Sequence, residues 1–366
     1  MTRPLPHRGR HRVRVDRGDP GARHRRAAGR AARAAGGRSR GPHARTQRGP
    51  HHHDPRPGTR ERLSPPHESV SRLVNIIQAL FDAVSTGAVY ALAALGIGLV
   101  FGVMRLANFA NGELITAAGY ALIILWPVSW PLAIVASIAV AVALALAMDA
   151  AVFRWIRSQP PATLLIASFG VSILLQRVYD GVFGTNVLSA AVAPGLATSI
   201  RIGELRINLI TIVSIVLAGV LLVAVRVFLT RTRMGLQVQA ASEDFRAARV
   251  LGIRAGSVIA LTFAISGILA AAIAFVLTAQ SGSVGPTFGV QVTLFALIGS
   301  TIGGLGRLGG SVAGGFLVGF AVSLFTTFLP AWINDFRIAF VYLLVAIVLV
   351  IAPNGIFASR TSKERT

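Results

Sequence analysis

The sequence has 366 residues, of which 53% are hydrophobic, and it contains no cysteine. The absence of cysteine excludes disulfide bonds, thiolate metal sites and cysteine nucleophiles. The net charge of +22 would suggest a nucleic-acid binder, but 19 of the 36 Lys and Arg residues precede residue 73 and the long apolar runs all follow it. The chain is therefore a basic, polar leader joined to a hydrophobic body.

The leader, residues 1–72, is rich in Arg, Gly, Pro, Ala and His. It has no apolar periodicity, so we expect it to be disordered. Three interpretations are open: a tail that binds anionic lipid or nucleic acid, a targeting peptide, or a stretch that is absent from the mature protein. A secretory signal needs a short apolar segment near the start, which the leader lacks. Arginine without lysine is typical of translated GC-rich DNA, so we favour a mis-assigned start, with Val70 as the alternative.

The body, residues 73–358, contains apolar runs of membrane length. A helix crosses the ~30 Å hydrocarbon core with about 20 residues, and these runs lack the alternation of strands. We predict an all-α, polytopic transmembrane helical bundle of 8–9 spans with a short cytosolic coupling helix and a cytosolic tail at residues 359–366. The predicted spans lie near residues 75–104, 112–127, 131–152, 162–180, 208–230, 256–280, 287–304, 311–329 and 338–353.

Positive charges between the predicted spans give the orientation. If nine spans alternate in direction, the Arg-rich loops between the spans and the tail after the last span all lie on the same side of the membrane. That side is then the cytosol. The loop at 181–207 and the N-terminus are external in this arrangement. An external leader with 19 arginines is unfavourable, so either the leader is not genuine or the number of spans is even.

Residues 106–120, LANFANGELITAAGY, place polar side chains beside two predicted spans. Unpaired amides are costly in hydrocarbon, so this segment must lie in protein or line a wet cavity. One interpretation is a cytosolic turn, capped by Asn and Gly, with Glu113 in the first turn of the next helix. The other is a partly re-entrant segment that lines a translocation path. The path candidates are Asn108, Asn111, Gly112, Glu113 and, from the span at 162–180, Gln176.

Residues 231–254 form the longest polar run in the body. From Ala240, small apolar residues recur at 247, 248 and 251, which predicts one face of an amphipathic helix. Ser242 is placed to cap a helix that begins there, and Gly252 suits the left-handed position that ends one. We predict a short cytosolic helix that docks a partner, and the alternative is a surface helix lying on its own bundle. The predicted docking residues are Glu243, Asp244, Ala247, Ala248, Leu251, Gly252 and Ile253.

Residues 296–319 are rich in glycine, but no Gly-Lys-Ser/Thr motif and no preceding strand accompany them. A nucleotide site is therefore not predicted here, and the pattern predicts close helix packing around a turn at Arg307. This hairpin and the turn at 105–113 each interrupt the predicted spans late in one half of the body. In transporters, interruptions at corresponding places of the two halves can flank a substrate site.

The stretch GAVYALAALGIGLVFGVMRLANFANGEL, residues 87–114, resembles the opening of the membrane permeases of branched-chain amino acid ABC importers. The family's Asn-Phe-Ala-His-Gly-Glu motif corresponds to residues 108–113, with Asn111 in place of the histidine. Four further segments are similar to the family in the same order, up to APNGIFA at 352–358. One of them, residues 244–253, is similar to the segment that docks the ATPase.

The resemblance implies a multi-pass permease subunit in a bacterial inner membrane that carries branched-chain or related amino acids. Because the sequence has no nucleotide motif, metal cluster or catalytic constellation, we expect no enzymatic activity and no cofactor, with ATP hydrolysed by a separate subunit. The implied partners are ABC ATPase subunits, a sister permease in a heterodimer, and a periplasmic or lipid-anchored substrate-binding protein, and we expect no nucleic acid. The alternatives are a urea or amide importer permease, or an ATPase-independent channel for a small polar solute.

Overall fold

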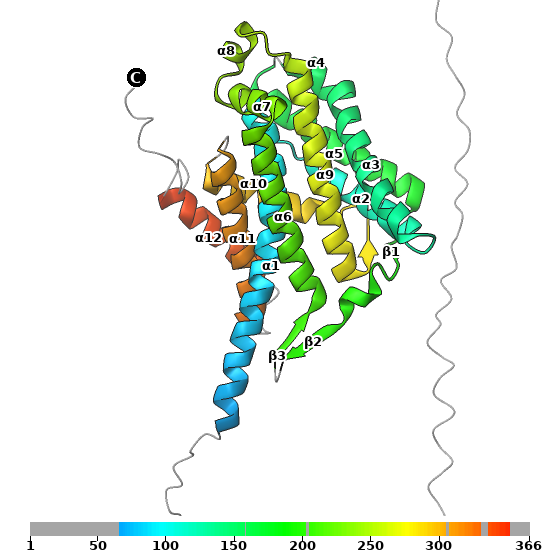
Figure 1. Cartoon of the computed structure of the whole chain (residues 1–366), viewed down its shortest axis with the longest axis vertical. Coiled ribbons are helices and arrows are strands. Elements are labelled where there is room, and N and C mark those ends of the chain that lie inside the picture. Colours follow the sequence, from blue (N-terminus) through cyan, green and yellow to red (C-terminus); the bar gives the residue numbers. More distant parts are fainter. Residues whose placement is uncertain (1–65, 158, 203–204, 305–306, 331–335, 352–366) are drawn as a thin grey trace, which may run out of the picture. The chain divides into compact units, whose positions relative to one another are not determined.

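The computed structural model describes residues 66–157, 159–202, 205–304, 307–330 and 336–351, and these residues are largely helical (Figure 1). The helices are α1 (Pro66–Met104), α2 (Asn111–Leu125), α3 (Trp130–Met148), the π-helix η1 (Asp149–Phe153), α4 (Arg154–Ile156), α5 (Pro161–Phe183), the 3-10 helix η2 (Pro194–Ala197), α6 (Leu209–Arg231), α7 (Arg233–Glu243), α8 (Phe245–Val250), α9 (Ala255–Ser281), α10 (Val290–Gly303), α11 (Leu308–Phe328) and α12 (Arg337–Ile351). Within the same residues, the strands form two antiparallel pairs: β1 (Leu188–Ser189) with β4 (Ser283–Val284), and β2 (Ser199–Ile202) with β3 (Leu205–Asn208). Most of the leader, the APNGIFA segment and the predicted tail at 359–366 lie outside the described residues.

Six helices of the described part are long and apolar enough to cross a membrane. They are Leu73–Met104, Trp130–Ile156, Pro161–Phe183, Leu209–Arg231, Ala255–Ser281 and Leu308–Phe328. The expected count of 8–9 spans is not confirmed, because α2 and α10 have only 15 and 14 residues. At 1.5 Å per residue each is roughly 22 Å long, which is shorter than the ~30 Å hydrocarbon core. The last predicted span corresponds to α12, which has 15 described residues.

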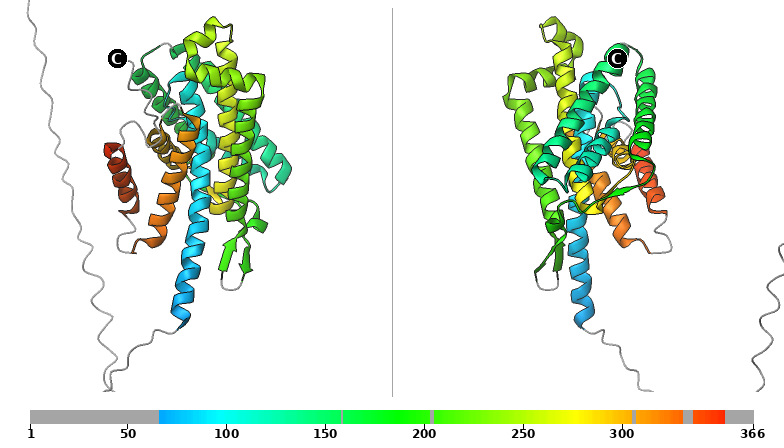
Figure 2. Two further views of the ribbon diagram at one scale, coloured as in Figure 1. Left: turned by 60° about the vertical axis from the view of Figure 1, so that its left-hand side comes forward. Right: turned by 90° about the vertical axis from the view of Figure 1, so that its right-hand side faces the viewer.

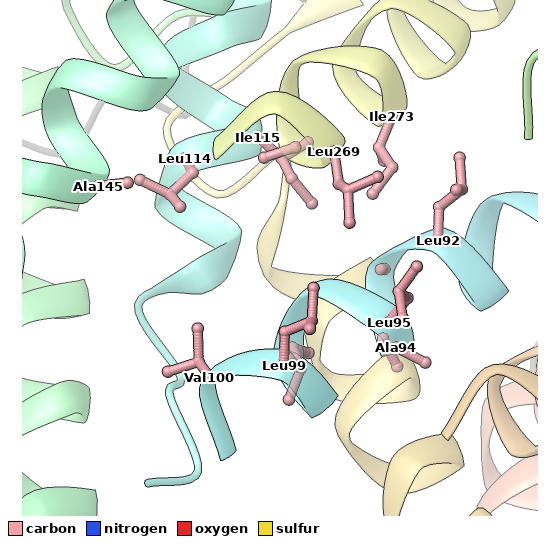
Figure 3. Packing of buried hydrophobic residues seen from close by; sticks show 14 of the residues in the cluster. Leu92, Ala94, Leu95, Leu99, Val100, Leu114, Ile115, Ala145, Leu269 and Ile273 are labelled. Carbon is pink, nitrogen blue, oxygen red and sulfur yellow. The ribbon is translucent and has the colours of Figure 1, made fainter. Parts of the chain in front are cut away.

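Helix α1 forms the centre of the helical unit. In its most apolar window 89% of the residues are buried, compared with 28%, 22% and 17% for the spans that contain α3, α5 and α6. Helices α6, α9, α10 and α11 all contact α1. Figure 3 shows leucines of α1 among buried side chains of α2 and α9, with Leu99 and Ile115 among them. An apolar helix with low internal burial has its remaining surface available for lipid or another subunit, whereas α1 is covered by its own chain.

Glycines bring α10 and α11 close together, as the sequence predicted for residues 296–319. A Cβ atom on Gly299 would lie 2.6 Å from the Cα atom of Gly315, and one on Gly315 would lie 2.7 Å from the backbone oxygen of Tyr90 in α1. No side chain fits at either contact. The glycine-rich segment therefore serves helix packing.

The order of long helix, irregular segment, short helix and long helix occurs twice along the chain. It is seen first in α1, 105–110, α2 and α3, and again in α9, 282–289, α10 and α11. Helices α1 and α9 run in opposite directions (Figure 1). A left-handed residue follows each of them: Arg105 has φ 55° and Gly282 has φ 63°. In this order of elements the interruption at 105–110 corresponds to 282–289, whereas the sequence analysis paired 105–113 with the 296–319 hairpin.

Candidate functional site

The polar residues of the 106–120 segment lie at the N-terminus of α2 and are buried. Asn108 is 1% exposed and Glu113 is 0% exposed. The Oδ1 atom of Asn108 accepts a hydrogen bond from the backbone N–H of Ala110 at 3.1 Å, and Ala110 precedes the helix without a side-chain cap. The segment therefore combines features of both interpretations: an Asn-stabilised turn with Glu113 in the first helical turn, placed inside the protein and not at an exposed surface.

The carboxylate of Glu113 joins α2 to α5. Its Oε1 atom accepts hydrogen bonds from the Ser172 hydroxyl at 2.7 Å and from the Gln176 Nε2 atom at 2.9 Å. The Tyr179 hydroxyl donates to the backbone oxygen of Glu113 at 2.9 Å. The Oε2 atom is buried and has no hydrogen-bond partner among the described residues. The structure thus brings together Glu113 and Gln176, two of the predicted path residues, from segments 63 residues apart.

Asn111 and Gly112 connect the same helix to the second half of the chain. The Ser266 hydroxyl of α9 donates to the Asn111 Oδ1 atom at 2.6 Å. A Cβ atom on Gly112 would lie 2.8 Å from the backbone oxygen of Gly289 and 2.9 Å from the Thr293 Oγ1 atom. The N-terminal turn of α2 is therefore packed directly against the N-terminal turn of α10.

Residues of α10 complete this contact and were missed by sequence reasoning. The Gly289 N–H donates to the Thr116 Oγ1 atom at 3.0 Å. Thr293 is 1% exposed, and its hydroxyl has no partner among the described residues. The available signal was the Gly-Pro at 285–286, which marks a break between α9 and the apolar run that follows.

The predicted docking segment consists of two helices. Asp244 ends α7 with φ −143°, and its Oδ1 atom accepts a hydrogen bond from the Ala247 N–H at 3.0 Å at the start of α8. Ser242 instead donates to the backbone oxygen of Gln239 within α7, so its predicted capping role is wrong. Aspartate competes with the helix by binding its own local N–H groups, which breaks the run at residue 244.

The C-terminal end of α8 agrees with the sequence prediction. Gly252 is left-handed with φ 84°, and its N–H donates to the Arg249 oxygen at 3.1 Å. The Ile253 N–H donates to the Ala248 oxygen at 3.1 Å. This pair of bonds is a Schellman motif, which requires a residue that tolerates positive φ.

The exposed surface of the segment differs from the predicted face. Ala248 is only 3% exposed and belongs to the hydrophobic core of this chain, so it is unavailable to a partner. Glu243, Asp244, Ala247 and Gly252 are exposed, and Ile253 is half-buried. The two large apolar side chains that face away from the protein are Val250, at 88% exposed, and Leu251, at 81% exposed.

A family model described as "Branched-chain amino acid transport system / permease component" matches residues 79–353. The chain belongs to this family. The matched residues include both short helices, the α7–α8 segment and all but the first residues of α1. Residues 1–78 lie outside the match.

Three relatives illustrate the range of this permease family. The high-affinity branched-chain amino acid transport permease LivH of Salmonella typhimurium is 28% identical over 301 residues, which cover 76% of this chain and 94% of LivH. BraD of Pseudomonas aeruginosa, a permease of the same description, is 27% identical over 300 residues, covering 78% of this chain and 96% of BraD. The autoinducer 2 import system permease LsrC of Photorhabdus luminescens is 33% identical over 135 residues, covering 35% of this chain and 41% of LsrC. No solved structure matches the chain.

Proposed function

We propose that this chain is the membrane permease subunit of a binding-protein-dependent ABC importer in a bacterial inner membrane, carrying branched-chain or related amino acids. The observation that carries the proposal is the family match over residues 79–353. The relatives that bear the branched-chain amino acid description align over 94% and 96% of their length, whereas LsrC aligns over 41%. The proposed partners are two ABC ATPase subunits, a sister permease and an external substrate-binding protein.

We place α7 and α8 in the cytosol. Arginines are concentrated at and near this end of the molecule, at 226, 231, 233, 249 and 254. The β2–β3 pair lies at the opposite end of α6 (Figure 2), which makes it external. Positive charge beside membrane spans is retained on the cytosolic side, so the orientation follows from these arginines.

We propose that the translocation path runs past the contact between α2 and α10. Discontinuous helices that end inside the membrane body are the places where transporters expose polar backbone groups to substrate. Both N-terminal turns here carry buried polar side chains, and glycines bring the two turns into contact. The path candidates are Asn108, Asn111, Gly112, Glu113 and Gln176, and we add Gly289 and Thr293 because both lie against Gly112.

The proposed coupling route leads from the ATPase to this contact through α9. The exposed Val250 and Leu251 would dock into the ATPase, since large apolar side chains at a protein surface favour a partner. Helix α9 begins at Ala255, directly after this segment, and carries Ser266, which is bonded to Asn111. Ser266 lies 11 positions after Ala255, roughly 17 Å along the helix, so a displacement of α8 would be transmitted along a rigid element to α2.

Reconstitution in lipid vesicles tests the proposal. Vesicles that contain the chain with its sister permease and ATPase subunits are expected to accumulate labelled leucine when ATP and the binding protein are supplied. Flux of leucine through the chain alone would favour the ATPase-independent channel. Inhibition of leucine uptake by excess urea or amide, with uptake of labelled urea, would favour the urea or amide importer.

A further inference from the structure

On the external side of the proposed orientation, the connection from α5 to α6 begins with a strap, defined as residues 184–193. Its strand β1 pairs with β4, which lies in the interruption at 282–289 between α9 and α10. The Ala190 N–H extends this pairing by donating to the Gly282 oxygen at 3.0 Å. Both strands also contact α2. The strap therefore joins an external loop to the segment that leads into the contact between α2 and α10.

Val192 anchors the strap in a small apolar cluster. It is 3% exposed, whereas the other residues of the strap are exposed or half-buried. The cluster also contains Tyr120 of α2, Tyr179 of α5 and Val284 of β4. Val284 is packed so closely on α2 that a Cβ atom at Gly119 would lie 3.0 Å from its Cγ2 atom. The strap and β4 together thus cover the C-terminal half of α2.

The same cluster contacts the residues that we propose for the translocation path. The ring of Tyr179 lies 5.7 Å from that of Tyr120, and its hydroxyl donates to the backbone oxygen of Glu113 at 2.9 Å. Phe288, in the interruption before α10, packs against the cluster and directly precedes Gly289 of the α2–α10 contact. A movement of the strap with β4 would therefore reach both sides of that contact.

The closed strap retains two unfavourable features. Ala193, at its C-terminal end, has φ 50°, a left-handed conformation that is unfavourable for a residue with a Cβ atom. The Tyr120 hydroxyl is buried and has no hydrogen-bond partner among the described residues, so its desolvation is not compensated. Release of the strap would let Ala193 relax and let water reach the hydroxyl. Both features oppose the burial of Val192, which favours two alternative positions of the strap.

We propose that the strap is the external gate of the translocation path, closed in this structure by the β1–β4 pair and by the insertion of Val192. Opening separates β1 from β4 and uncovers the C-terminal half of α2 toward the external side. The pair is only two residues long on each strand, and so short a pair is marginally stable by itself. Gly184, with φ 82°, provides a pivot at the other end of the strap. The proposal rests on the proposed function, because it names the element that admits substrate from the binding protein.

The absence of cysteine from the chain allows a cross-linking test. Ser189 and Ser283 are register partners, and directly opposed residues of antiparallel strands have Cα atoms about 4.5–5.5 Å apart, which a disulfide can bridge. The Ser189→Cys/Ser283→Cys variant is reconstituted in vesicles with the sister permease and the ATPase subunits and is oxidised with copper–phenanthroline. Oxidation is expected to lower ATP-dependent leucine uptake roughly tenfold or more, because the gate can no longer open. Reduction with dithiothreitol is expected to restore it.

The matched control is Arg201→Cys/Arg206→Cys, which places a disulfide between register partners of the β2–β3 pair in the same external loop. This disulfide does not join the loop to residues 282–289, so oxidation is expected to leave uptake unchanged. Tyr120→Phe provides a second test, because it removes the unpaired hydroxyl and stabilises the closed state. It is expected to raise the thermal stability of the complex and to slow uptake, whereas a purely structural cluster would give higher stability with unchanged uptake.

Several results would overturn the gate. They are wild-type uptake by the oxidised β1–β4 variant, failure of that pair to cross-link, an equal loss of uptake on oxidation of the β2–β3 variant, or unchanged uptake by a stabilised Tyr120→Phe. A wild-type complex that assembles without transporting leucine would instead refute the proposed function, whether or not the strap can be cross-linked.

Discussion

Replacement of Gly112 by alanine tests the contact between α2 and α10. The new Cβ atom would lie 2.8 Å from the Gly289 oxygen and 2.9 Å from the Thr293 hydroxyl, both closer than real Cβ contacts allow. The two short helices must therefore separate or tilt by several tenths of an ångström. Overpacking of this kind costs about 1–3 kcal/mol. Helix propensity acts in the opposite direction, because alanine is favoured over glycine by about 1 kcal/mol inside a helix.

We expect Gly112→Ala to insert in the membrane, to lower the thermal stability of the complex and to reduce ATP-dependent leucine uptake by roughly tenfold or more, the factor that corresponds to about 1.4 kcal/mol on the transport barrier. Uptake is measured in vesicles at matched protein levels, and stability by the loss of monodisperse complex on heating. Gly170→Ala is the matched control, since Gly170 is helical, exposed and has nothing within 4 Å of its Cβ position. Wild-type uptake by Gly112→Ala, or an equal loss with Gly170→Ala, would refute the reasoning.

Three further predictions concern other parts of the proposed machinery. Glu113→Ala leaves the buried Ser172 hydroxyl of α5 without the carboxylate that accepts its hydrogen bond, at about 1–3 kcal/mol, and is expected to lower both thermal stability and uptake. Unchanged values would show that the carboxylate is dispensable. Replacing Val250 and Leu251 together by Asp is expected to abolish co-purification of the ATPase while the permease still inserts, and a surviving complex would show that α8 is not the docking element. Asp82→Leu removes a half-buried carboxylate that accepts a hydrogen bond from the Thr211 hydroxyl at 3.3 Å, joining α1 to α6, so lower uptake or lower protein level is expected. Normal uptake and level would mean that Asp82 merely lies near the interface.

The sequence was sufficient to locate the long helices. The span predicted at 256–280 is α9, Ala255–Ser281, and the span predicted at 208–230 is α6, Leu209–Arg231. These elements are predictable because an unbroken run of apolar residues of that length has no stable alternative to a helix in lipid. The left-handed end at Gly252 was predictable for a similar local reason, since glycine tolerates positive φ without a steric penalty.

The two short helices show what hydropathy leaves open. Residues 112–127 and 287–304 are apolar, so hydropathy alone assigns them as spans, but α2 and α10 are shorter than the six helices that are long enough to cross a membrane. Whether such a helix crosses the bundle or begins inside it depends on what meets its N-terminus. Here Gly112 and Gly289 meet each other, which is a contact between residues far apart in the sequence. The same limit explains why the bond between Glu113 and Ser172, across 59 residues, was not foreseen.

The helical character of residues 231–254 was predicted, but their division into two helices was not. The amphipathic pattern correctly indicated a polar helical connection, but local capping by Asp244 divided it in two. Burial of Ala248 depends on how α8 packs on the rest of the chain, and the sequence contains no sign of it. As a result, the exposed apolar surface that we propose for ATPase docking lies at Val250 and Leu251.

The most direct test of the central claim is leucine transport by the reconstituted complex. We predict that vesicles containing this chain, its sister permease and the ATPase subunits accumulate leucine against its gradient only when ATP and the binding protein are both present. Vesicles containing this chain alone are predicted to show no flux. Leucine flux without the ATPase, or no accumulation in the complete system, would contradict the assignment as the permease subunit of an ABC importer.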